Sequence, residues 1–320
     1  MTSTTLPQRE KTEPVSAPRK GLSDRSRAER KLGWMLAGPA FAVMLLVTAY
    51  PILQAVYYSL FNYRLTDPEN RSFVGLSNYG VILTDSLWWQ ALWVTVFITV
   101  VTVVVELVLG FALAMVMAKA LKALRPLLRA VILIPYAVIT VVSALAWKFA
   151  FDIDTGFVNH WFSWLPGISA ETDWFGDQWS SLAVVCVAEI WKTTPFISLL
   201  LLAGLAQVPD VLQEAAMVDG ATWWQRLWKV TIPNMKAAIM VALLFRTLDA
   251  FRIFDSIFVM TGGANNTESV SFLAYRQTIS RLEIGLGSAV SVMLFICVVL
   301  ICALFIKGFK VDLAATRGDK

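Results

Sequence analysis

The chain has 320 residues, of which 57% are hydrophobic and only 16% are charged, and its mean hydropathy is +0.64. Soluble globular domains contain about 45–50% apolar residues and about 25% charged ones, so this composition excludes an ordinary soluble globule. The formal net charge of +4 is informative through its distribution along the chain.

Six apolar segments are long enough to cross about 30 Å of hydrocarbon at roughly 1.5 Å per residue. They cover residues 34–60, 91–118, 127–150, 180–205, 237–260 and 285–306. The sequence therefore predicts an all-α integral membrane protein with six transmembrane helices in residues 34–310. We expect a disordered basic arm at residues 1–33 and a short tail at residues 311–320.

Positive charge is distributed unequally among the connecting segments. Five Lys and Arg lie in the loops of one side, and nineteen lie in the N-terminal arm, in residues 307–320 and in the two loops near residues 119–130 and 206–236. Because cytoplasmic loops carry an excess of Lys and Arg, both termini are predicted to lie in the cytoplasm. The same bias explains the basic N-terminus, so no nucleic-acid partner is expected.

Several kinds of site are not expected in this chain. Cys186, Cys297 and Cys302 all fall inside predicted spans, and His160 is the only histidine. We therefore expect neither a metal site nor a disulfide framework. The sequence also lacks G-x-x-x-x-G-K-[ST], so we expect no ATP-hydrolysing activity in the chain itself.

The second apolar segment and the connection after the third carry isolated polar features. Glu106 is a lone ionisable residue, for which a structural hydrogen bond is favoured over a proton-coupling role. The connection at residues 151–178 is acidic and contains Trp161, Trp164 and Trp174. This pattern is typical of a membrane–water interface, with a docking surface for an external partner as the alternative.

The fourth apolar segment is interrupted by the polar residues Glu189, Lys192, Thr193 and Thr194. Glu189 and Lys192 are three residues apart and are expected to pair. Pro195 is expected to break the helix in mid-span, which frees backbone carbonyls. Broken helices with polar residues near the membrane centre mark substrate sites in many transporters. Trp191 and Phe196 either stack on a substrate or pack in the core.

A short polar segment at residues 209–233 separates the fourth and fifth apolar segments. Asp210 is expected to cap a first helix, which Gly220 ends in a left-handed conformation. Thr222 is expected to cap a second helix, which Pro233 ends. Two short helices joined at a fixed angle form a rigid projection, which is suited to transmit a movement of a partner protein to the membrane helices.

The fifth apolar segment contains Arg246, Asp249, Arg252 and Asp255, each three residues from the next. On a helix these alternating charges form a self-neutralising ladder. Charges inside a span normally face a bundle interior or a wet cavity. The ladder is interpreted either as the polar wall of a translocation path or as a buried ion network that fixes helix packing.

The run Glu214-Ala215-Ala216-Met217-Val218-Asp219-Gly220-Ala221, followed by Ile232-Pro233, resembles the EAA loop of bacterial ATP-binding cassette (ABC) importer permeases. Further segments resemble the maltose-type sugar permeases within that family; they are residues 73–79, 134–136, 146–148, 191–196, 254–263 and 285–289. The likeness covers residues 34–310. Residues 245–255 and 262–267 resemble the trehalose-importing permeases of actinobacteria.

This resemblance implies a type I importer permease fold in the plasma (inner) membrane, with no cofactor bound by the chain. It implies as partners a second permease, two ATPase subunits that bind ATP and Mg²⁺, and an extracytoplasmic sugar-binding lipoprotein. The residues implied for coupling to the ATPase are Glu214, Ala215, Ala216, Asp219, Gly220, Ala221 and Pro233. Those expected along the substrate path are Glu189, Lys192, Thr193, Phe196, Arg246, Asp249, Arg252 and Asp255.

Other functions remain open at this point. Trehalose is favoured by resemblance, and maltose, another α-glucoside or glycerol-phosphate is the alternative. A second class is an ion-coupled transporter that uses Glu106, Glu189 and the charged ladder. A membrane hydrolase is remote, because no Ser/His/Asp or metal-ligand set is present.

Overall fold

The computed structural model describes residues 24–121 and 123–308 and divides the chain into two units, residues 1–53 and 54–320. Helix α1 (Asp24–Ser59) begins well before residue 34, so the last part of the predicted arm is helical. Residues 24–33 are rich in Arg, Glu, Lys and Ala, which favour helix. The remainder of the predicted arm and the tail at 311–320 lie outside the described residues.

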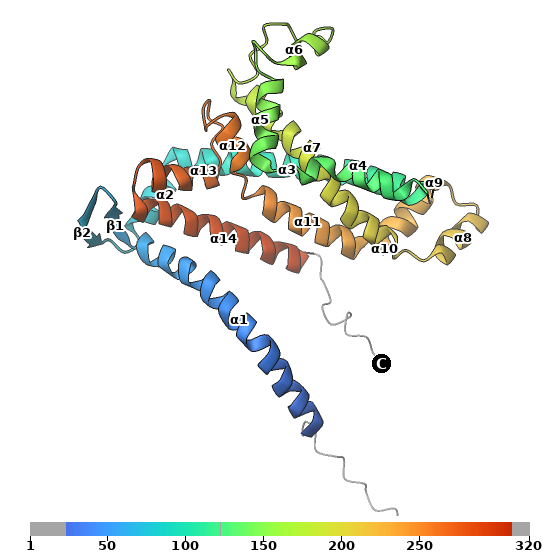
Figure 1. The fold of residues 1–320 in the computed structure, drawn as a ribbon, viewed down its shortest axis with the longest axis horizontal. Coiled ribbons are helices and arrows are strands. Elements are labelled where there is room, and N and C mark those ends of the chain that lie inside the picture. The colour runs from blue at the N-terminus through green and yellow to red at the C-terminus, as the bar shows by residue number, and fades with distance from the viewer. Residues whose placement is uncertain (1–23, 122, 309–320) are drawn as a thin grey trace, which may run out of the picture. The chain divides into compact units, whose positions relative to one another are not determined.

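The second unit contains one antiparallel pair of strands, β1 (Phe61–Arg64) and β2 (Asp67–Phe73), and a series of helices (Figure 1). The helices are α2 (Ser77–Thr84), α3 (Ser86–Lys119), α4 (Arg125–Ala137), α5 (Thr140–Ala150), α6 (Phe157–Phe162), α7 (Gln178–Leu205), α8 (Asp210–Val218), α9 (Trp223–Arg226), α10 (Ile232–Asn234), α11 (Lys236–Ala250), α12 (Asp255–Met260), α13 (Val270–Tyr275) and α14 (Ile284–Gly308). Two π-helical turns are η1 (Leu227–Thr231) and η2 (Arg276–Ser280).

Four helices among the described residues are long and apolar enough to cross a membrane: α3, α7, α14 and the part of α1 from Lys31 to Ser59. Helices α4 and α5 pass the same test together, but they are bent by 85° at their junction. The structure therefore offers four apolar spans, or five if the bent pair is one span. By the criteria of length and apolar composition, the described helices do not reach the predicted six membrane spans.

The expectation of one continuous helix at residues 237–260 is wrong. Helix α11 ends at Ala250 and α12 begins at Asp255. Between them Phe251 and Ile253 are buried, whereas Arg252 is exposed. An unbroken helix would place its four charged residues around the helix axis, where some would meet hydrocarbon. The break instead allows Arg252 to be exposed while its apolar neighbours remain buried.

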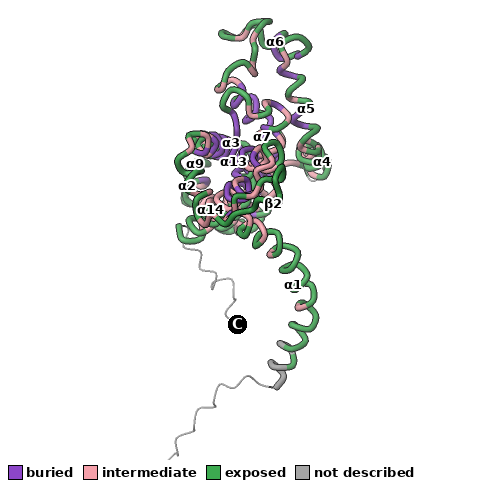
Figure 2. The backbone as a smooth tube through the Cα atoms, turned by 90° about the vertical axis from the view of Figure 1, so that its left-hand side faces the viewer, coloured by how far each residue is buried: buried purple, intermediate pink, exposed green. Residues whose placement is uncertain are grey.

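Helices α3 and α7 form the framework of the second unit, and buried residues line both of them (Figure 2). One apolar cluster includes Val94 and Ile98 of α3 and Leu182 of α7. Gly110 permits close approach of the two helices, because a Cβ there would lie only 2.8 Å from Cγ2 of Ile197. A second cluster joins α11 to this pair through Ala242.

Helix α7 runs through Pro195 without interruption, so the predicted break in the fourth segment is wrong. Proline removes one N–H donor and leaves carbonyls of the preceding turn in need of partners. Thr193 Oγ1 lies 2.6 Å from the carbonyl oxygen of Glu189, and Thr194 Oγ1 donates to the carbonyl of Ile190 at 2.6 Å. The carbonyl that Pro195 leaves without its i+4 donor is that of Trp191, and the helix continues past it.

Candidate functional site

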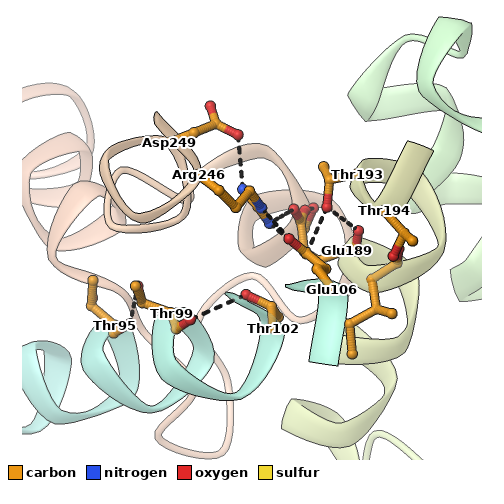
Figure 3. Close-up of polar contacts among 11 residues, drawn as sticks. Thr95, Thr99, Thr102, Glu106, Glu189, Thr193, Thr194, Arg246 and Asp249 are labelled. Atoms are coloured by element: carbon orange, nitrogen blue, oxygen red, sulfur yellow. Dashed lines mark hydrogen bonds and ion pairs between the residues drawn. The ribbon is translucent and has the colours of Figure 1, made fainter. Parts of the chain in front are cut away.

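A buried ion network joins three helices at the centre of the second unit (Figure 3). Arg246 of α11 places Nε 2.5 Å from Oε2 of Glu106 on α3 and Nη2 2.9 Å from its Oε1. The same Nη2 lies 3.4 Å from Oε2 of Glu189 on α7. The side chain of Arg246 is 2% exposed and that of Glu106 is fully buried. One guanidinium therefore ties α3, α7 and α11 together.

Hydroxyl groups complete this network. Thr193 Oγ1 lies 2.6 Å from Oε1 of Glu106, and Ser256 at the start of α12 donates to Oε1 of Glu189. Glu106 is thus not a lone group, and the structural hydrogen bond favoured for it is present. Sequence reasoning did not find its partner Arg246, because the two residues lie on helices far apart in the chain.

The expected ion pairs form only in part. Glu189 pairs with Arg246 and not with Lys192, whose Nζ lies 5.7 Å from the ring centroid of Tyr136. The buried guanidinium needs a second carboxylate more than the partly exposed ammonium does. In the fifth segment, Arg246 and Asp249 pair at 2.8 Å as expected. The rest of the ladder does not form, because the helix ends before Arg252.

Two adjoining cavities of about 390 and 360 Å³ lie beside the ion network. They share a lining of Tyr136, Thr193, Arg246, Asp249 and Arg252. Each of the eight residues expected along a substrate path lines one cavity or both; the others are Glu189, Lys192, Phe196 and Asp255. Helices α4, α7 and α11 and the break before α12 bring these side chains together.

The site includes one aromatic residue, Tyr136, that the sequence-based prediction of the substrate path did not include. Tyr136, near the end of α4, stacks on Phe196 of α7 with ring centroids 5.3 Å apart and an interplanar angle of 17°. Pro135 is the sequence signal that α4 ends near this point. Trp191 packs edge-on against Trp147 and does not line either cavity. Of the two aromatic residues proposed in the fourth segment, only Phe196 faces the cavities.

The 209–233 loop has the predicted turn and the predicted helix cap at Thr222, but not the predicted cap at Asp210. Gly220 has φ of +75°, and the N–H of Ala221 donates to the carbonyl of Ala216 at 2.9 Å, which ends α8 as expected. Thr222 caps α9 in a capping box with Gln225. Asp210 is the first residue of α8, however, and its side chain makes no capping hydrogen bond. Pro209 occupies the cap position instead.

Pro233 does not end the second helix of this loop. Helix α9 continues through the π turn η1 into α10, which contains Pro233, and α11 follows directly after Met235. Proline is tolerated in the first turn of a helix, where its missing N–H has no intrahelical partner. The loop is therefore helical up to the start of α11, and this stiffens its connection to that helix.

The outer surface of the loop carries both acidic and apolar side chains. Glu214 and Asp219 are exposed. Val218 is 88% exposed, and Trp224 and Trp228 are each 62% exposed. Exposed apolar residues rimmed by polar ones mark protein interaction sites. The geometry is suited to docking a partner on this face.

The acidic connection at residues 151–178 also exposes aromatic residues. Trp161 and Trp164 are exposed, whereas Trp174 is partly buried and donates through Nε1 to Oδ1 of Asn159 at 2.6 Å. Hydrogen bonds from Thr155 lower the pKa of Asp152 below its usual range. The connection is thus a structured element whose Trp side chains are available for an interface.

Comparison with known proteins defines the class of this chain. Residues 106–309 match the family model described as "Binding-protein-dependent transport system inner membrane component". The chain is 52% identical over 282 residues to the trehalose transport system permease protein SugA of Mycobacterium tuberculosis, covering 88% of this chain and 90% of that protein. It is 38% identical to the trehalose/maltose transport system permease protein MalF of Thermococcus litoralis, covering 87% and 94%.

A solved structure confirms the fold. The chain superposes with a TM-score of 0.75 and 18% identity on a bacterial ABC transporter involved in the import of the acidic polysaccharide alginate, covering 91% of this chain and all of that one. The chain therefore belongs to the family of binding-protein-dependent transport system inner membrane components, and it has the type I permease fold of ABC importers.

Replacement of Glu106 tests the ion network. We expect Glu106→Gln to destabilise the folded protein by about 3–5 kcal/mol, because it leaves a buried guanidinium without its main partner. Asp249→Asn is the matched control: it removes a partner of the same Arg246, but Asp249 is 66% exposed, so about 0–1 kcal/mol is expected. Thermal unfolding of the purified permease complex measures both. Equal midpoints for the two variants would contradict the assignment.

Proposed function

We propose that this chain is a permease subunit of an ABC importer that carries a disaccharide such as trehalose. The substrates named for the relatives at 52% and 38% identity support this choice. Maltose and other α-glucosides are the alternative substrates. Ion-coupled transport through Glu106 is disfavoured, because that carboxylate is committed to Arg246 and Thr193.

The observation that carries this proposal is the polar, aromatic-lined cavity between membrane helices. A sugar presents hydroxyl groups at its edges and apolar C–H groups on the faces of its rings. Asp249, Arg252 and Asp255 offer acceptors and donors for hydroxyl groups. Tyr136 and Phe196 offer aromatic faces for a ring. Asp255 lines one of the two adjoining cavities and Phe196 lines the other, so a ligand that extends across both has both kinds of contact.

The 209–233 loop supplies the proposed connection to ATP hydrolysis. In this proposal its exposed face docks onto the two ATPase subunits, which bind ATP and Mg²⁺. A second permease subunit and an extracytoplasmic sugar-binding lipoprotein complete the importer. Alternating access requires that nucleotide and sugar favour different conformations, because a ligand with equal affinity for both states shifts neither.

The proposed topology has six spans and both termini in the cytoplasm, with α11 and α12 together as the interrupted fifth span. Contacts between connections support it. Arg64 pairs with Glu283 at 2.9 Å, and Gln178 Nε2 donates to the carbonyl of Asn266, so connections assigned to the outside touch one another. The 209–233 loop lies at the other end of this unit, away from β1 and β2 (Figure 1).

Single cysteines test this topology. In a background without Cys186, Cys297 and Cys302, a membrane-impermeant thiol reagent added to intact cells should label Asn70→Cys and Ser163→Cys. Ala123→Cys and Lys229→Cys should react only after permeabilisation. All four positions are exposed, so accessibility of the side chain does not limit the comparison. Labelling of position 229 in intact cells would overturn the docking role of the loop.

Two changes in the loop test coupling. Glu214→Lys reverses an exposed charge, and Gly220→Val forces a side chain into a left-handed conformation at about 1–2 kcal/mol per residue. We expect both to reduce co-purification of the ATPase and trehalose uptake while the permease remains inserted. Glu171→Lys, an exposed acid in the 151–178 connection, is the control and should leave ATPase binding intact. Normal ATPase binding and uptake in both loop variants would exclude coupling through this face.

Arg252→Gln tests the sugar path. Arg252 is exposed, lines both cavities and has no ion pair among the described residues, so its loss should spare the yield of the complex. If it bonds the sugar, the loss of one charge-assisted hydrogen bond, about 1.5–3 kcal/mol, raises the KM for trehalose at least about tenfold. ATP-dependent uptake by proteoliposomes that contain the whole importer measures this, with Arg129→Gln as control.

An unchanged KM for Arg252→Gln with normal yield would place the sugar elsewhere. Uptake driven by an ion gradient without the ATPase subunits would favour the ion-coupled alternative over the importer. A loss of yield without a change in KM would assign Arg252 to assembly.

A further inference from the structure

A third cavity lies between the 209–233 loop and the ends of α3 and α7. It has a volume of about 340 Å³ and is separate from the cavities beside the ion network. The ends of α3 and α7 form one wall, and α8, α9 and η1 form the other. The side chain of Gln213 closes part of it by donating to Oγ1 of Thr231 at 2.9 Å.

Two cationic side chains and one carboxylate line this cavity. Lys119 is the last residue of α3, Arg226 is the last residue of α9, and Asp210 is the first residue of α8. Nε of Arg226 is buried and has no hydrogen-bond partner. No ion pair joins Arg226 to Asp210 among the described residues. A buried guanidinium nitrogen without a partner is unfavourable unless a ligand supplies an acceptor.

The wider surroundings of the cavity are also positive. Arg125, Arg129, Lys229 and Lys236 lie on the neighbouring segments, and they outnumber the acids Glu214 and Asp219. Such a surplus raises the local concentration of anions. Arginine is suited to phosphate in particular, because its planar fork matches two oxygens at once.

The position of the cavity favours an anion that is attached to a lipid. It lies where α3 and α7 end, and both helices are apolar enough to cross a membrane. Met115, Leu205 and Val208 line its side toward those helices. Trp223 lies beneath Lys119, with Nζ 5.9 Å from the ring centroid, and tryptophan is enriched at the headgroup level of membranes. Basic pockets between membrane helices are known to bind lipid headgroups.

We propose that this cavity binds the phosphate-bearing headgroup of an anionic phospholipid, with Arg226 and Lys119 as its ligands. The bound headgroup bridges the end of α3 to α9 and holds the 209–233 loop against the helices that carry the sugar cavity. Anionic lipid is therefore expected to regulate the importer through this loop. This site goes beyond the proposed transport function and does not depend on which sugar is carried.

Native mass spectrometry of the intact permease–ATPase complex tests the proposal, because lipid retention is read directly and not through transport. With added phosphatidylglycerol, we expect the wild-type complex to retain one lipid for each copy of this chain. Arg226→Gln and Lys119→Gln should each bind phosphatidylglycerol about tenfold more weakly, as expected for the loss of one charge-assisted hydrogen bond. Lipid retention is compared only among complexes that assemble. If one of the two variants fails to fold, the other still tests the site.

The controls separate a built site from general charge attraction. Arg129→Gln removes an exposed cation outside the cavity lining and should retain phosphatidylglycerol as the wild type does. Equal retention in all four proteins would overturn the proposal. Binding of inorganic phosphate without lipid retention would assign the site to a soluble anion and overturn the lipid assignment. A photo-crosslink from position 226 to the ATPase, with no lipid retained by the wild-type complex, would assign the cavity to that partner and overturn the lipid assignment.

Discussion

The buried guanidinium of Arg246 is the constraint on which the rest of this structure depends. A charge among apolar helices is tolerated only when it is paired and hydrogen-bonded, and Arg246 takes its partners from α3 and α7. These two helices also approach each other closely at Gly110. Helix α11 is thus positioned by charge as well as by apolar contact.

The break between α11 and α12 follows from the same network. The carboxylate of Glu189 contacts both Arg246 and Ser256, which lie on different sides of the break. On a continuous helix these two residues would be about 15 Å apart along the axis, so one side chain could not serve both. The chain turns between them, and the turn directs Arg252 into the cavities while Phe251 and Ile253 remain buried.

The network also lies on the two helices that flank the 209–233 loop. Helix α7 carries Glu189 and leads into the loop, and α11 carries Arg246 and begins directly after it. A Cβ at Gly204 would meet the side chain of Ala238, so the two helices also lie close together near the loop. In the proposed importer, a movement of the loop therefore reaches both walls of the sugar cavity through helices that the ion network holds together.

The sequence by itself determined the features that depend on neighbouring residues: the long apolar helices, the left-handed Gly220 and the helix cap at Thr222. It also named eight of the residues that line the cavities, although it missed Tyr136. Only the tertiary structure decided that Glu189 pairs with Arg246, that α7 continues through Pro195 and that the fifth segment is interrupted. A buried charge is satisfied by groups on other helices, and a local pattern does not specify which of them come within reach.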